Sequence, residues 1–158
     1  MRIPRIYLET TMFNYYFEPE REAHADTVKL FEEIKEGRYQ AFTSVYALRE
    51  LRDAPPEKMK KMLALVDEYC ITTLDFSPEA EQLANIYVRE GIIPTRYGTD
   101  GVHIAVATVN DLDMIISLNF KHIVRKKTIE LTEHVNIREG YHKIGIYTPM
   151  EVVDRDPE

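Results

Sequence analysis

Residues 98–123 read GTDGVHIAVATVNDLDMIISLNFKHI, and this stretch decides the fold. Residues 102–109 are apolar on almost every face of a helix, which predicts a helix that is buried all round. Thr99 is expected to cap this helix, and Asp100 to lie in its first turn. A helix of this kind belongs inside a layered domain, so the flanking sequence should supply a sheet and further helices.

The second half of the same stretch predicts a turn and a strand. The Asn and Asp residues within 110–113 break the helix and turn the chain. Residues 114–117 form a short apolar run of strand length, typical of a strand buried on both sides. The chain then leaves this strand at Asn119, and in an open parallel sheet ligands bind at the carboxyl ends of the strands.

The remainder of the chain alternates strand and helix patterns with short connections. Strands are expected at residues 5–9, 39–44, 71–74 and 144–147, and helices at 25–36, 46–52, 57–69, 77–90 and from Thr148 onward, while 126–138 is amphipathic or irregular. This order predicts an α/β protein, a three-layer α/β/α sandwich with a mostly parallel sheet of four to five strands. Residues 1–153 are expected to form the domain, and 154–158 a flexible tail.

Composition places the chain among ordinary globular proteins. It has 158 residues, of which 44% are hydrophobic and 30% charged, which fits one domain with a real core. No apolar run approaches the ~20 residues of a membrane span, and the N-terminus lacks the apolar core of a signal peptide. We therefore expect a cytoplasmic protein without a membrane partner. Cys70 is the only cysteine, which excludes an internal disulfide, and its neighbours suggest a core thiol.

Charge limits how the chain can hold nucleic acid. With 27 acidic and 20 basic residues, the formal net charge is −7. This balance disfavours proteins that bind nucleic acid by bulk positive charge. It does not exclude a nuclease, because a carboxylate site is negative until a divalent metal fills it.

Three carboxylates are expected at the carboxyl edge of the predicted sheet. Glu9 ends the first strand, Glu50 lies on the helix after the second strand, and Asp100 opens the buried helix. Clustered carboxylates suit Mg²⁺ or Mn²⁺, which prefer oxygen ligands. Simpler interpretations remain open: Glu50 can be a solvated residue paired with Arg49 or Arg52, and Asp100 can merely favour the helix dipole.

Two segments resemble the PIN-domain family of metal-dependent ribonucleases, which includes the toxins of toxin–antitoxin pairs. The family pattern is D-A-x-H-I-A-x-A, followed by a strand that ends in T-x-D or T-W-N before F-x-H. Here residues 100–107 read DGVHIAVA and residues 117–122 read SLNFKH. The resemblance implies a PIN-like fold and cleavage of single-stranded RNA with Mg²⁺ or Mn²⁺ as cofactor. It also implies a possible toxin role, with an antitoxin protein as partner, and a homodimer.

The same resemblance assigns the candidate catalytic residues. It makes Glu9, Glu50 and Asp100 metal ligands and Asn119 the fourth catalytic position. Two departures count against full activity: Glu9 stands where Asp is common, and neutral Asn119 replaces an acid. The alternative is a catalytically weak or inactive PIN-fold binding module that acts through RNA or protein contacts, and Asn119 can also simply cap the next turn.

Other polar residues surround these positions in the sequence. Thr10, Thr11 and Asn14 are expected to orient the metal ligands without contacting the metal themselves. His103 is expected to be a core histidine whose ring nitrogens have hydrogen-bond partners. The densest basic run is expected to be either a solvated surface or a set of RNA phosphate contacts. It consists of Lys121, His122, Arg125, Lys126 and Lys127. The aromatic run at residues 13–17 can supply a partner surface or belong to the core.

Overall fold

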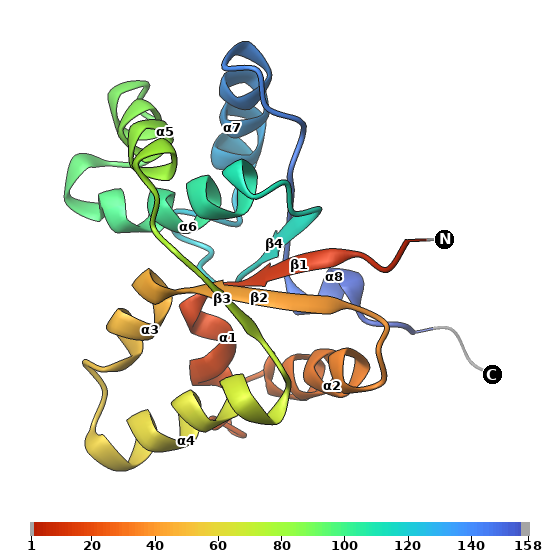
Figure 1. Ribbon diagram of the computed structural model, residues 1–158. Coiled ribbons are helices and arrows are strands. Elements are labelled where there is room, and N and C mark those ends of the chain that lie inside the picture. The colour runs from red at the N-terminus through yellow and green to blue at the C-terminus, as the bar shows by residue number, and fades with distance from the viewer. Residues whose placement is uncertain (1, 156–158) are drawn as a thin grey trace.

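The computed structural model describes residues 2–155 as a five-stranded sheet between two layers of helices (Figure 1). The strands are β1 (Arg5–Leu8), β2 (Gln40–Ser44), β3 (Thr72–Leu74), β4 (Met114–Ile116) and β5 (Gly145–Tyr147). All neighbours pair in parallel, in the order β3-β2-β1-β4-β5. The predicted three-layer α/β/α class with a parallel sheet is therefore confirmed.

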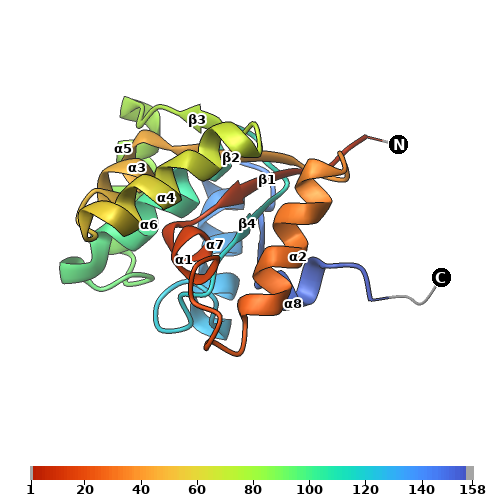
Figure 2. The same ribbon diagram turned by 90° about the horizontal axis from the view of Figure 1, so that it is seen from below.

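Helices cover both faces of the sheet. One face carries α1 (Thr10–Tyr15), α2 (His24–Lys35), α4 (Pro56–Glu68) and α8 (Pro149–Val152). Of these, α1, α2 and α4 come to the front when the molecule is viewed from below (Figure 2). The other carries α5 (Pro78–Arg89), the short 3-10 helix η1 (Thr95–Tyr97), α6 (Gly98–Val109) and α7 (Lys126–Arg138). Helix α3 (Val45–Leu51) follows β2 and contacts both α1 and α6.

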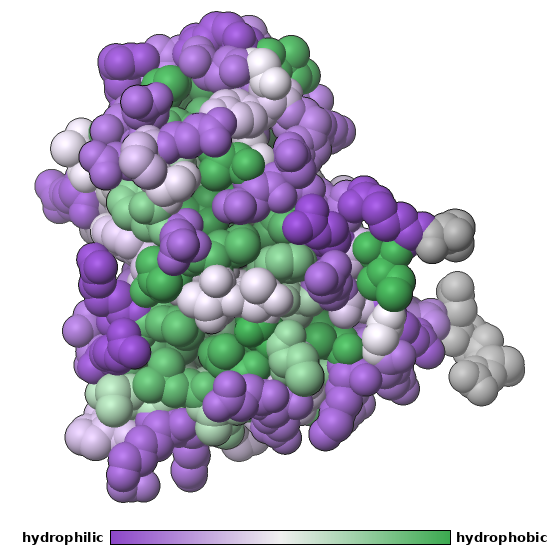
Figure 3. Space-filling view, viewed as in Figure 1, coloured by the Kyte–Doolittle hydropathy of each residue, from purple (hydrophilic) through white to green (hydrophobic). Residues whose placement is uncertain are grey.

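Alternation along β1 divides the interior into two cores. Tyr7 faces the core beneath α5, α6 and α7, whereas Ile6 and Leu8 face the core shared with α1, α2 and α4. All three side chains are fully buried, because β1 is central and helices cover both of its faces. On the face seen in Figure 3, hydrophobic residues show across the middle, where β3 forms one edge of the sheet.

The strand order reverses beside β1. The chain runs outward through β2 and β3 and then returns to place β4 on the other side of β1. Such a switch point opens a crevice at the carboxyl ends of the two strands that flank it. Residues that directly follow β1 and β4 therefore meet at one place, although more than 100 positions separate Glu9 from Ser117 along the chain.

Two local expectations were wrong, for Thr99 and Cys70, and the open alternative at residues 126–138 was decided in favour of a helix. Thr99 does not cap the buried helix, because η1 leads directly into α6, which begins at Gly98 with Tyr97 at its N-cap and no side-chain cap. Residues 126–138 form a regular helix, α7. Cys70 is exposed with a φ of 53°, because it turns the chain between α4 and β3 instead of entering the core.

The end of the described chain is attached to the domain. Arg155 pairs with Asp26 at 2.7 Å, and Asp154 pairs with Arg38 at 3.1 Å. Residues 156–158 of the expected tail lie outside the described residues. Among the helices of residues 2–155, none combines the length and the apolar character that crossing a bilayer requires.

Candidate active site

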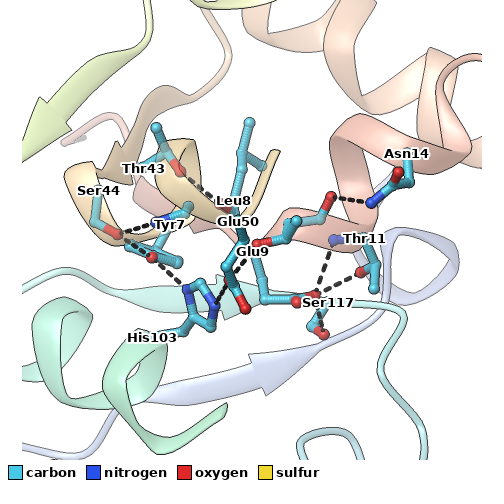
Figure 4. A network of polar contacts seen from close by, with 12 residues as sticks. Tyr7, Leu8, Glu9, Thr11, Asn14, Thr43, Ser44, Glu50, His103 and Ser117 are labelled. Carbon is cyan, nitrogen blue, oxygen red and sulfur yellow. Dashed lines mark hydrogen bonds and ion pairs between the residues drawn. The ribbon is translucent and has the colours of Figure 1, made fainter. Parts of the chain in front are cut away.

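Glu9 links the carboxyl ends of β1 and β4. Its side chain is only 4% exposed and caps α1. Its Oε1 atom accepts hydrogen bonds from Thr11 Oγ1 at 2.5 Å, Thr11 N at 3.2 Å and Ser117 Oγ at 2.7 Å (Figure 4). Thr11 Oγ1 in turn accepts from Leu118 N at 2.8 Å. Residues from both strand ends thus hold this carboxylate in one orientation.

Glu50 reaches the same edge from α3. Its Oε1 atom accepts a hydrogen bond from Thr10 Oγ1 at 2.7 Å and lies 2.6 Å from His103 Nε2. His103 Nδ1 lies 2.6 Å from the hydroxyl of Tyr7, which lies 2.8 Å from Ser44 Oγ. This chain of contacts joins α3, α6, β1 and β2 behind the acidic edge. His103 is fully buried with partners on both nitrogens, so the prediction of a satisfied core histidine is confirmed.

Glu50 and His103 stabilise each other's charged forms. Burial acts to raise the pKa of Glu50, but the hydrogen bond and charge of His103 and the hydrogen bond from Thr10 outweigh it, and the pKa is lowered. Burial acts to lower the pKa of His103, but the hydrogen bond and charge of Glu50 and the charges of Glu9 and Asp100 outweigh it, and the pKa is raised. The Glu50–His103 contact lies behind the site, where it fixes Glu50, and it is an ion pair when His103 is protonated.

Asp100 completes the set of carboxylates. It lies in the first turn of α6, three residues before His103 and on a neighbouring part of the same helix face. Burial raises its pKa and the negative charge of Glu9 adds to this, while His103, His122 and a hydrogen bond with Asn119 act in the opposite direction. Glu50, Glu9 and Asp100 all act on the pKa of His103, so the three carboxylates lie around this side chain at the carboxyl edge.

Asn119 stabilises the backbone that follows β4 at this edge. Its Oδ1 atom accepts a hydrogen bond from His122 N at 3.0 Å, and its own N donates to Ser117 Oγ at 2.9 Å. The first bond caps the turn that follows, which was the simpler interpretation of this residue. Asn119 also acts to lower the pKa of Asp100, so its side chain lies beside the acids as well.

Two of the three expected supporting residues contact a carboxylate, and the expectation for Asn14 was wrong. Thr10 holds Glu50 and Thr11 holds Glu9, as described above. Asn14 Nδ2 donates to the backbone oxygen of Thr10 at 3.2 Å, so it acts on the local helix and not on a carboxylate.

The basic run is divided by burial. Lys121, Arg125, Lys126 and Lys127 are exposed, as phosphate-contacting side chains must be. Lys121 Nζ lies 5.4 Å from the centre of the Tyr97 ring. His122 does not belong with these residues. It is 8% exposed, stacks on Tyr97 with ring centres 4.3 Å apart, and neither ring nitrogen has a hydrogen-bond partner within residues 2–155.

Sequence reasoning missed two members of the site. Ser117 was assigned only to a strand, although a hydroxyl at the end of an apolar run was a usable signal. Tyr7 gave no signal, because its polar partners Ser44 and His103 come from distant parts of the chain. The aromatic run proved mixed: Phe13 is fully buried, while Tyr15, Tyr16 and Phe17 are partly exposed against the same core.

The candidate site offers carboxylate oxygens as ligands for a metal ion. Within residues 2–155, no group of three or more His, Cys, Asp or Glu side chains is gathered closely enough to hold a metal. The donor chemistry nevertheless fits a hard cation, since it consists of carboxylate oxygens. In the described chain, Oε2 of Glu9 and Oε2 of Glu50 accept no hydrogen bond, and each therefore retains a lone-pair oxygen for a ligand.

Comparison with known proteins identifies the fold. No family model and no curated protein matches the sequence. Among solved structures, VapBC2 from Rickettsia felis, bound to a DNA fragment from its promoter, aligns with a TM-score of 0.57 and 12% identity over 91% of this chain and 98% of that chain. VapC20 from Mycobacterium tuberculosis, a Sarcin-Ricin loop cleaving toxin, aligns with a TM-score of 0.56 and 13% identity over 70% and 86%.

DNA-bound VapBC from Salmonella typhimurium aligns with a TM-score of 0.53 and 15% identity over 92% of this chain and 98% of that chain. VapC proteins are PIN-domain toxins of toxin–antitoxin systems, so the resemblance to PIN domains is confirmed at the level of the fold. At 12–15% identity this likeness concerns the fold alone.

Proposed function

We propose that this chain is a metal-dependent endoribonuclease that hydrolyses phosphodiester bonds of single-stranded RNA, acting as the toxin of a toxin–antitoxin pair. One observation carries the proposal. Glu9 and Glu50 are held in fixed orientations beside Asp100 at the switch point of the sheet. Burial and the charge of Glu9 disfavour the ionised form of Asp100, a cost that a function can explain and packing does not.

Glu9, Glu50 and Asp100 are the residues that would hold Mg²⁺ or Mn²⁺. A bound divalent ion would neutralise charge on the scissile phosphate and lower the pKa of a water molecule. Burial and the charge of Glu9 raise the pKa of Asp100, which supports a cation as a ligand of this carboxylate. A bound cation would stabilise all three carboxylates in their ionised forms.

The other residues orient these acids and receive the RNA. Thr11 and Ser117 fix one oxygen of Glu9 and leave Oε2 to face a ligand. Thr10 and His103 do the same for Glu50. Asn119 would act as a neutral fourth position through its amide. Lys121, Arg125 and Lys126 are exposed after β4 and would contact RNA phosphates.

The test is cleavage of a mixed pool of single-stranded RNA with Mn²⁺ or with EDTA. Wild type should cut only with metal, and Asp100→Asn should lose cleavage because a hard-cation site loses one of its three charges. Asp67→Asn is the matched control, since Asp67 is an exposed acid on α4, and it should cut like wild type. Equal cleavage by wild type and Asp100→Asn would refute the proposed mechanism.

A second candidate, a catalytically weak or inactive binding module, is favoured by neutral Asn119 and by the absence of a gathered metal cluster within residues 2–155. Asn119→Asp separates the two candidates. In a nuclease, the added charge should tighten Mn²⁺ binding measured by calorimetry and raise cleavage. If wild type neither binds Mn²⁺ nor cuts RNA, and Asn119→Asp restores neither, the binding module becomes the better account.

Partner binding forms part of the proposal. VapBC2 and the Salmonella protein are complexes of a toxin with its antitoxin, which supports an antitoxin segment as partner of this chain. We also propose a homodimer. Light scattering on the purified chain tests the dimer, and a monomer at high protein concentration would contradict it.

A further inference from the structure

A cavity of about 360 Å³ lies beside the acidic edge, where α3, α5 and the start of α6 meet, at the left of Figure 1. Two aromatic side chains contribute to its wall: Tyr46 from α3 and Phe76 from the segment between β3 and α5. Their ring centres lie 5.4 Å apart in an edge-to-face arrangement. The volume falls within the range of pockets that hold small molecules, ~300–1,000 Å³.

The cavity shares its walls with the active site. Tyr46 lies one helical turn before Glu50 on α3, and its ring contacts that of His103, with centres 6.3 Å apart. On α6, Thr99 lines the cavity and directly precedes Asp100. An RNA strand with one phosphate at the three carboxylates can therefore place an adjoining group in this cavity.

The residues that line the cavity favour a neutral, flat ligand. Ala84, Val88 and Val102 add apolar wall beside the aromatic rings. The rim carries one acid, Glu81, and one base, Arg89, so it presents no excess of either charge to a free phosphate. Hydroxyl and amide groups complete the rim, and they can donate or accept hydrogen bonds. These polar residues are Asn85, Thr95 and Thr99.

Unpaired RNA bases have the same character. They stack on aromatic side chains and use their edges for hydrogen bonds, whereas duplex bases are covered by their neighbours. We propose that this cavity, formed around Tyr46 and Phe76, binds one unpaired nucleobase adjacent to the scissile phosphate. This inference rests on the proposed ribonuclease function, and it assigns base preference to Tyr46, Phe76 and Asn85, which contribute no carboxylate to the site.

The first experiment uses nucleosides, because they carry no phosphate and need no metal. Adenosine, guanosine, cytidine and uridine are titrated separately into ¹⁵N-labelled wild type and followed by amide chemical shifts. At least one nucleoside should move the signals of Asn85, Gly98 and Thr99. Phe76→Leu keeps an apolar side chain but removes the stacking ring, and it should weaken binding about tenfold.

One further variant is a control for this titration, and a second tests the rim of the cavity. Tyr39→Leu removes a partly exposed ring that lies just before β2, at the opposite end of the sheet, and it should bind nucleosides like wild type. Asn85→Ala changes an exposed residue of α5, where alanine favours the helix, and it should weaken binding without unfolding the chain. Circular dichroism establishes that each variant is folded.

The second experiment maps cleavage positions in the mixed RNA pool. Wild type should favour one base beside the cut, and Phe76→Leu should lose that preference while still cutting with Mn²⁺. Nucleoside binding without any cleavage would support the base pocket and contradict the nuclease. Cleavage with an unchanged base preference in Phe76→Leu, or signals of Asn85, Gly98 and Thr99 that no nucleoside moves, would overturn the base pocket and leave the nuclease standing.

Discussion

His103 Nε2 lies 2.6 Å from Glu50 Oε1, and this pair joins α6 to α3 across the carboxyl end of the sheet. The histidine is fully buried and the glutamate side chain is 32% exposed. The contact therefore holds a carboxylate at the site from behind and leaves its second oxygen for solvent or a ligand. Its pH dependence follows from the directions of the two pKa shifts.

The Glu50–His103 pair should stabilise the fold in a defined pH window. The folded-state pKa of His103 is raised, so its contribution is fully present below its ordinary value of 6.5 and is lost as pH rises through the raised pKa. The folded-state pKa of Glu50 is lowered, so its contribution is present above its ordinary value of 4.5 and is lost as pH falls through the lowered pKa. Urea unfolding of wild type and Glu50→Gln should differ most between about pH 4.5 and 6.5. A difference that stays constant from pH 3 to 9 would contradict this.

Asp100→Asn should leave the fold as stable as wild type at pH 7, or make it more stable. Burial and the charge of Glu9 raise the pKa of Asp100, so the ionised carboxylate disfavours folding once the pH exceeds its ordinary value of 3.8. The advantage of Asp100→Asn should therefore grow as pH rises through the raised pKa and then level off. Denaturant unfolding at several pH values, without divalent metal, measures it. A variant clearly less stable than wild type at pH 7 would show that the contacts of Asp100 with His103, His122 and Asn119 outweigh the cost of its burial.

Thr11→Val should destabilise the fold by about 2 kcal/mol. The hydroxyl donates to Glu9 and accepts from Leu118 N, so an isosteric methyl group leaves a charged acceptor and a backbone donor without this partner. Thr132→Val is the matched control, because the Thr132 hydroxyl is buried with no hydrogen-bond partner in the described chain. The same substitution there should be neutral or stabilising. Equal losses in the two variants would mean that the Glu9 network adds nothing to stability.

His122→Phe should keep or increase stability, by up to about 1 kcal/mol. The change retains a ring that can stack on Tyr97 and removes two buried nitrogens that have no partner within residues 2–155. Tyr97→Leu removes the stack instead, and should cost about 1 kcal/mol. Thermal unfolding measures both. A large loss in His122→Phe would show that the imidazole has a polar partner, such as an ordered water molecule.

Much of the fold could be predicted from local sequence. The largely apolar residues 102–109 predicted a buried helix, and α6 is that helix. The helix expected from residue 77 is α5, where the hydroxyl of Ser77 at the N-cap accepts from Ala80 N at 3.1 Å. Thr99 failed as a cap because the preceding 3-10 turn already supplies helical backbone, and sequence propensity does not report that continuation.

The candidate site could likewise be predicted from the sequence only in part. The sequence determined which acids follow strand ends or open helices, since the positions of Glu9, Glu50 and Asp100 depend on periodicity over a few residues. Only the tertiary structure decided what holds them. Ser117 donates to Glu9 across 108 positions, and Tyr7 meets His103 across 96. Such pairings depend on the strand order, which places β4 beside β1, and local propensities carry no information about contacts between segments so far apart.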